Sequence, residues 1–243
     1  MMRTREDIAR TIRQDGYVSL PAAETRRFFD SDGTALGGEP WRAFAESWGD
    51  LRPDTYMADG GRYRQRRHAT YAATPGGEIL RGAHRPHFQA LQHNPLNGGL
   101  ERWFEPVAAQ VGDGAPMMRL LAGAREVFEA SCGEAVPWHI EAHQFRIEAR
   151  PDAVGKPTPE GMHRDGVAFV LVTLIGRENV AGGVTGIRVD GRDGEASFTL
   201  EEPLDTVLLD DTRVWHGVTP ISPIDPARPG HRDVLVLTFA RPR

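Results

Sequence analysis

The stretch Gly161-Met162-His163-Arg164-Asp165-Gly166-Val167 carries the most informative pattern in this chain, and a further histidine, His216, follows Asp165 by 51 residues. His163 and Asp165 lie in a predicted loop just before an apolar run, where a tight turn can aim both side chains at one point. Two imidazoles and one carboxylate form the facial triad that holds non-haem Fe(II) and leaves coordination positions open. We therefore predict a metal centre built from His163, Asp165 and His216.

Two other His-x-Asp/Glu tripeptides compete with this one, His139-Ile140-Glu141 and His231-Arg232-Asp233. The first lies in a segment that alternates like a strand, so that His139 and Glu141 share one face. The second lies too near the C-terminus to have a third ligand downstream. His216, by contrast, follows a predicted strand and a turn, which suits a distant third ligand.

Composition excludes several classes of protein. The net charge of −5 does not indicate the basic surface that nucleic-acid binding requires, and no apolar stretch is long enough to span a membrane. The single cysteine, Cys132, cannot form an internal disulfide, and the N-terminus lacks the apolar core of a signal peptide. We expect a cytoplasmic protein with a small-molecule partner; the sequence does not predict an oligomeric state.

Hydrophobic periodicity separates a helical N-terminal part from a strand-rich C-terminal part. We predict helices over 5–14, 21–29, 99–110 and 115–131, with extended segments at 16–20 and 62–72. From Val136 onward, short extended runs follow one another at 143–149, 167–175, 183–189, 196–200, 206–209, 213–218 and 233–240. Many short strands separated by Gly, Pro and Asp turns are typical of a sandwich or barrel.

The expected fold class is therefore mainly β with a helical N-terminal layer, and the strand-rich part is a jelly roll of the cupin-like kind. We expect a single domain over residues 1–243, with a helical support region at 1–135 and the jelly-roll core at 136–243. No repeat, linker or low-complexity tract divides it.

Four C-terminal segments together resemble the bacterial 2OG-Fe dioxygenase family of amino-acid hydroxylases that includes L-isoleucine 4-hydroxylase. These segments are Gly161 to Val172, Asn179 to Gly183, Trp215 to Ile221 and Arg232 to Phe239. Upstream pieces are similar to that family as well: Arg62-Tyr63-Arg64, Asn94 to Gly99 with Arg102, and His143 to Ile147. The resemblance spans most of the chain.

This resemblance implies a double-stranded β-helix core, Fe(II), 2-oxoglutarate as cosubstrate, O₂, and ascorbate as an activator. It also implies that a basic residue on the last core strand holds the far carboxylate of 2-oxoglutarate. Arg232, 16 residues beyond His216, matches that position. Arg228 is its nearest rival, but it lies in a predicted loop.

The reaction implied is hydroxylation of an unactivated C–H bond in a free, mostly aliphatic L-amino acid, with release of succinate and CO₂. Halogenating relatives lack the carboxylate of the triad, whereas Asp165 is present here. Two alternatives stay open: the same chemistry on a tethered or modified amino acid or peptide, and a non-catalytic metal-binding jelly-roll domain.

Candidate substrate residues are Arg64, Gln144 and Arg146. Arg62, Arg64 and Arg66 share one strand face by alternation, although a solvated, charged edge strand explains at least two of them. Gln144 and Arg146 share one face of the strand before the metal loop, which could bring them to the pocket.

Overall fold

The computed structural model describes residues 3–94, 96 and 98–242. Its helices are α1 (Arg5–Asp15), α2 (Ala22–Phe29), α3 (Gly38–Glu46), the 3₁₀ helix η1 (Ser47–Asp50), α4 (Ala109–Gly112) and α5 (Ala115–Cys132). None of the helices in these residues is long and apolar enough to cross a membrane. Pro95 and Asn97, which belong to the family-like segment 94–99, lie outside the described residues.

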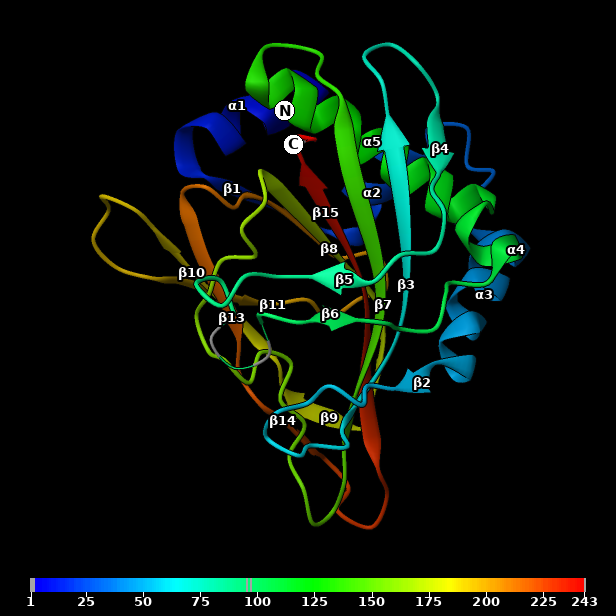
Figure 1. Ribbon diagram of the computed structural model, residues 1–243, viewed down its shortest axis with the longest axis vertical. Coiled ribbons are helices and arrows are strands. Elements are labelled where there is room, and N and C mark those ends of the chain that lie inside the picture. Colours follow the sequence, from blue (N-terminus) through cyan, green and yellow to red (C-terminus); the bar gives the residue numbers. More distant parts are fainter. Residues whose placement is uncertain (1–2, 95, 97, 243) are drawn as a thin grey trace.

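One large antiparallel sheet forms the centre of the molecule (Figure 1). Its strands lie in the order β1 (Tyr17–Leu20), β12 (Thr206–Asp210), β8 (Phe169–Glu178), β15 (Gly230–Ala240), β7 (Trp138–Ala149), β3 (Arg64–Ala73) and β2 (Arg52–Pro53), and β4 (Ile79–Arg81) also pairs with β3. The smaller sheets are β11 (Ala196–Thr199), β10 (Val184–Val189) and β13 (Val214–Val218); β14 (Ile221–Pro223) and β9 (Val180–Gly182); and β5 (His87–Phe88) and β6 (Glu101–Arg102).

The large sheet has two chemically different faces because successive residues of a strand point to opposite sides. On β15, Leu235, Leu237 and Phe239 are fully buried in the main core together with helix residues such as Leu120 and Phe128 of α5. The alternate residues of β15, from Arg232 to Ala240, line a cavity instead. The sheet therefore separates a helical layer from a hollow.

Local sequence signals explain where the first helix begins and ends. Thr4 and Asp7 form a reciprocal capping box at the start of α1. Gly16 ends the helix at a φ of +81°, and a Cβ at this position would lie 2.8 Å from a Val214 methyl. Only glycine satisfies both the left-handed backbone and the close approach to β13.

The mainly β fold class is confirmed, and the strands predicted after residue 136 all form. The predicted helix at 99–110 is wrong: it holds β6, an extended segment and the start of α4. Pro106 explains this because proline breaks a helix interior, and its neighbours Glu105 and Val107 exchange backbone hydrogen bonds with His68 of β3. Helix α3 was not predicted.

The division at residue 135 does not separate helices from strands. β3 pairs with β7 over ten residue pairs, from Arg64 opposite Ile147 to Ala73 opposite Trp138. The interpretation of at least two of Arg62, Arg64 and Arg66 as solvated residues of an edge strand is therefore wrong. Arg64 and Arg66 are buried, and only Arg62, which precedes the strand, is exposed.

The helical layer should contribute strongly to stability. Leu120→Ala in α5 removes a fully buried side chain and should lower the free energy of unfolding by about 2–5 kcal/mol, because a cavity remains where the side chain packed. Leu80→Ala is the matched control: this side chain is 62% exposed and should cost no more than about 0.5 kcal/mol. Urea denaturation of both variants measures the difference; equal losses would contradict this assignment of the core.

Candidate functional site

Two backbone hydrogen bonds bring the predicted metal loop to the strand β13. The amide of His163 donates to the carbonyl of His216 at 2.9 Å, and the amide of His216 donates to the carbonyl of His163 at 3.0 Å. The two imidazole rings consequently lie with their centroids 4.5 Å apart. The ligand atoms of His163, Asp165 and His216 all lie within 4.8 Å of one another, which is the cluster that the sequence predicted.

The orientation of both rings suits metal binding. Nδ1 of His163 donates to the carbonyl of Gly161 at 3.1 Å, which leaves Nε2 of that ring as the free nitrogen. Nε2 of His216 is buried and has no hydrogen-bond partner among the described residues. It lies 3.4 Å from Asp165 Oδ2. A buried nitrogen without a partner is costly, and a metal ion would satisfy it.

In this cluster, the pKa values of Asp165 and His216 depend on the charged side chains around them. Burial alone would raise the pKa of Asp165, but His216 and the charge of His163 hold it below its ordinary value. Burial opposes protonation of His216, yet Asp165 and Asp211 raise the pKa of that imidazole to about 9. The carboxylates of Asp165 and Asp211 thus favour a cation in the space between the three side chains.

Asp211 clamps the metal loop, and the sequence reasoning did not identify this role. Its carboxylate is buried and accepts hydrogen bonds from three consecutive amides, those of Asp165 (3.0 Å), Gly166 (2.8 Å) and Val167 (3.0 Å). The only available signal was the Asp210-Asp211 pair at the predicted turn.

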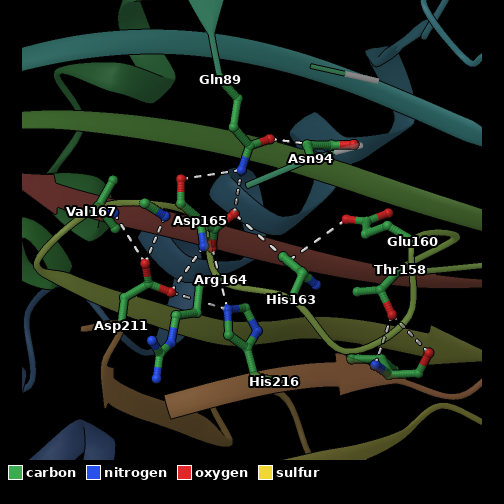
Figure 2. A network of polar contacts seen from close by, with 12 residues as sticks. Gln89, Asn94, Thr158, Glu160, His163, Arg164, Asp165, Val167, Asp211 and His216 are labelled. Atoms are coloured by element: carbon green, nitrogen blue, oxygen red, sulfur yellow. Dashed lines mark hydrogen bonds and ion pairs between the residues drawn. The ribbon is translucent and has the colours of Figure 1, made fainter. Parts of the chain in front are cut away.

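Gln89 approaches Asp165 from the opposite side. Its Nε2 lies 3.2 Å from the carbonyl oxygen of Asp165 and 3.3 Å from Oδ1, and Asn94 donates to the Gln89 Oε1 at 3.0 Å. Figure 2 shows His163, Asp165 and His216 pointing toward one another, with Gln89 and Asp211 on either side of the loop. The carboxylate is therefore oriented from two directions.

A cavity of about 580 Å³ opens beside the three side chains, within the usual size range of small-molecule sites. Arg232 of β15 lines it, is only 2% exposed, and has no partner for Nε or Nη2 among the described residues. Burial and nearby Arg177 lower the pKa of Arg232 to about 10, so the guanidinium remains charged at neutral pH. An unpaired buried cation in a cavity is suited to an anionic ligand. Arg228 is exposed and pairs with Asp225.

The structure separates the three candidate substrate residues. Arg64 lines the cavity, but its Nε donates to Asp54 at 2.8 Å. Gln144 and Arg146 do share one face of β7, as predicted, but it is the face turned away from the cavity. Gln144 donates to Ser47 Oγ at 2.9 Å, and Arg146 forms a bidentate pair with Asp233. Their placement in the pocket is corrected, because the odd-numbered residues of β7 line it.

Two of those odd-numbered residues, Glu141 and His143, belong to a second polar cluster that was not predicted from the sequence. His68, His87 and His143 surround the carboxylate of Glu141, and with it they form a second group of possible metal ligands. The alternation of His139, Glu141 and His143 on one strand face was the available signal. Arg102 of β6 lines the same part of the cavity and is 2% exposed.

Comparison with known proteins decides the family. The model of the 2OG-Fe dioxygenase family matches residues 45–238, most of the chain. The chain belongs to the 2OG-Fe dioxygenase family. This 2OG-Fe dioxygenase therefore uses Fe(II), 2-oxoglutarate and O₂, and the cluster of two imidazoles and a carboxylate is of the type that such an iron requires.

Several relatives are similar over most of their length. The 3(1)-hydroxy-L-isoleucine 4-dioxygenase of Pantoea ananatis is 25% identical over 181 residues, 73% of each chain. A BsmA homologue from Methylobium petroleophilum PM1 is 39% identical, with a TM-score of 0.88 over 99% of this chain and 94% of that one. IDO from Bacillus thuringiensis shares the fold, with a TM-score of 0.80 over 99% of this chain and 100% of that one at 18% identity.

The clamp on the metal loop should be needed for tight metal binding by this 2OG-Fe dioxygenase. Asp211→Asn replaces an acceptor oxygen with a donor that faces backbone amides, and residues that orient metal ligands typically contribute 10–100-fold to affinity. We expect a loss of about that size in anaerobic Fe(II) titrations. The neighbouring Asp210→Asn is the control, since the Asp210 carboxylate accepts hydrogen bonds from Thr212 alone among the described residues; equal losses in both variants would rule out the clamp.

Proposed function

We propose that the protein hydroxylates an unactivated C–H bond of a free, aliphatic L-amino acid and converts 2-oxoglutarate to succinate and CO₂. The observation that carries this proposal is one cavity that joins the triad His163, Asp165 and His216 to the unpaired Arg232. In this proposal the triad holds Fe(II), and Arg232 binds the distal carboxylate of 2-oxoglutarate.

The cofactors supply the oxidising chemistry, and the protein residues bind and orient the reactants. Asp211 and Gln89 fix the carboxylate of Asp165, and the carbonyl of Gly161 fixes the ring of His163. Val172, Val234 and Val236 line the cavity near Arg232. Apolar walls exclude water from the salt bridge to the cosubstrate and so strengthen it.

The walls of the cavity also support a small aliphatic substrate. Ala90, Val167 and Val218 contribute apolar surface close to polar groups. The similarity to the isoleucine-derivative dioxygenase points in the same direction. The presence of the Asp165 carboxylate supports hydroxylation, because halogenation requires a free coordination position on the metal and this side chain would fill it.

The decisive assay incubates the protein with Fe(II), ascorbate, 2-oxoglutarate and each of the twenty amino acids in turn. We expect mass spectrometry to find one aliphatic amino acid that gains one oxygen, without chlorination in the presence of chloride, with one succinate formed per product. Succinate formation without any oxidised amino acid would favour a tethered or modified substrate instead.

The matched variants for this assay are His163→Ala and His231→Ala, which both alter a His-x-Asp sequence. His163→Ala should abolish Fe(II) binding and turnover while the protein stays folded by circular dichroism. His231→Ala should retain both. Full turnover by His163→Ala would contradict the proposed metal centre. The same conclusion would follow if the parent protein formed no succinate with any substrate.

Arg232→Ala should raise the concentration of 2-oxoglutarate needed for half-maximal turnover by orders of magnitude. Breaking a buried charge pair costs about 3–5 kcal/mol, which corresponds to a factor of roughly 100 to 4,000. Arg228→Ala removes an exposed arginine of the preceding loop and should leave that requirement unchanged. The reverse pattern would show that the wrong arginine has been assigned.

A further inference from the structure

Arg102 is a second buried guanidinium group without an anion. Its side chain is 2% exposed and lines the cavity, and no described residue forms a hydrogen bond or an ion pair with it. Its nearest ring, that of Phe104, has its centroid 5.8 Å from the guanidinium carbon. Burying an unpaired cation is unfavourable, so this position calls for an anionic partner that is not part of the protein.

The neighbouring arginines do not share this property. Arg64 is paired with Asp54. Arg66 lies 3.6 Å from the same carboxylate and contacts Nδ1 of His143 at 2.6 Å. Its guanidinium is stacked between two aromatic rings, those of Phe104 at 3.7 Å and Phe145 at 4.4 Å. Both guanidinium groups therefore have polar or aromatic partners within the protein.

Among the described residues, Arg102 and Arg232 are thus the two deeply buried arginines that lack a hydrogen bond, and both line one cavity. One 2-oxoglutarate neutralises only one of them at its distal carboxylate, while the metal centre takes the other end. A second anion is then needed to neutralise the other arginine, and a planar guanidinium matches a carboxylate in particular.

Glu141 supplies the opposite charge on the same side of the cavity. Its Oε2 lies near ring nitrogens of His68, His87 and His143, at 3.3 Å from His68 and 3.4 Å from His143. Its Oε1 has one long contact, at 3.4 Å, from the half-exposed ring of His139. One carboxylate oxygen is therefore held by imidazoles while the other remains available to a donor in the cavity.

The tautomers of these rings make a metal ion a poor occupant. Arg66 donates to Nδ1 of His143, so the proton of that neutral ring is on Nε2, which faces Glu141. Burial lowers the pKa of His87 to about 4 and lowers the pKa of His68 as well. Neutral rings that donate N–H groups to a carboxylate leave no lone pair pointing at a shared metal position.

Arg102 and Glu141 are linked through one residue. His87 lies directly opposite Arg102 in the β5–β6 pair, and its Nδ1 contacts the Glu141 carboxylate. Directly paired residues have Cβ atoms about 4.5–5.5 Å apart. His87 and Arg102 are the inward residues of these strands, whereas Phe88 and Glu101 are exposed. A cationic group and an anionic group therefore line the cavity with one residue, His87, between them.

We propose that Arg102 binds the α-carboxylate of the substrate and that Glu141, fixed by its imidazoles, binds the α-ammonium group. This inference rests on the proposed function and specifies it. It requires a substrate whose amine and carboxylate are both free, and it excludes a residue within a peptide. The side chain of the amino acid is then left to point toward the triad.

The test measures binding by isothermal titration calorimetry without O₂, using protein loaded with Fe(II) and 2-oxoglutarate. The probes are L-isoleucine, L-leucine and L-valine, followed by the carboxamide and the N-acetyl derivative of whichever binds most tightly. The parent protein should bind the free amino acid about 100-fold or more tightly than either derivative, because each leaves one buried charge without its partner.

Two variants then assign each half of the substrate. Arg102→Gln should bind the free amino acid and its carboxamide with similar affinity, yet still discriminate against the N-acetyl derivative. Glu141→Gln should show the opposite pattern. Arg228→Gln, at an exposed position outside the cavity, should behave as the parent does. Thermal unfolding and a 2-oxoglutarate titration show whether each variant is folded and loaded; if a Gln variant is unfolded, Arg102→Lys and Glu141→Asp replace it.

Several results would overturn the assignment. The assignment is wrong if none of the three amino acids binds, or if one variant loses discrimination against both derivatives. It is also wrong if Arg102→Gln mainly weakens the binding of 2-oxoglutarate. Glu160 also lines the cavity, so loss of discrimination against the N-acetyl derivative in Glu160→Gln and not in Glu141→Gln would assign the ammonium group to Glu160. A second metal ion per chain that disappears in Glu141→Gln would show that the cluster is a metal site. Because binding is measured without O₂, these failures are distinct from an absence of succinate in the turnover assay, which contradicts the proposed function itself.

Discussion

The pair of backbone hydrogen bonds between His163 and His216 is the constraint on which the candidate site depends. It joins a loop to a strand of the small sheet and sets the two imidazoles side by side. Asp211 then fixes the turn that carries Asp165, because one buried carboxylate satisfies three successive amides. The three ligand atoms are therefore arranged by the backbone and need little further ordering when a metal binds, which reduces the entropic cost of binding.

The large sheet supports this arrangement because its two faces have opposite chemistry. One face packs against the helices through apolar residues and supplies stability. The other face places charged groups of β3, β7 and β15 around the cavity. Buried charges are expensive unless they are paired, and the protein pairs most of them. The exceptions, Arg102 and Arg232, mark where ligands complete the charge balance.

The sequence predicted the strand-rich half and the metal cluster because both depend on short-range patterns. Alternation identifies strands, and the His163–Asp165 spacing needs only one turn. The sequence did not show that Gln144 and Arg146 face away from the cavity, because alternation groups residues on one face without saying which face is inward. The association of Arg102 with Glu141 was missed for a related reason: it depends on β5, a two-residue strand too short to give a periodic signal.

The central claim is that one cavity holds a metal at the triad and two anions at two separate arginines. A crystal structure of the protein with Mn(II), 2-oxoglutarate and the amino acid selected by calorimetry tests this most directly. We predict Mn(II) between His163, Asp165 and His216, the distal carboxylate of 2-oxoglutarate on Arg232, and the carboxylate of the amino acid on Arg102. Metal bound at His68, His87, Glu141 and His143, or 2-oxoglutarate seated on Arg102, would contradict it.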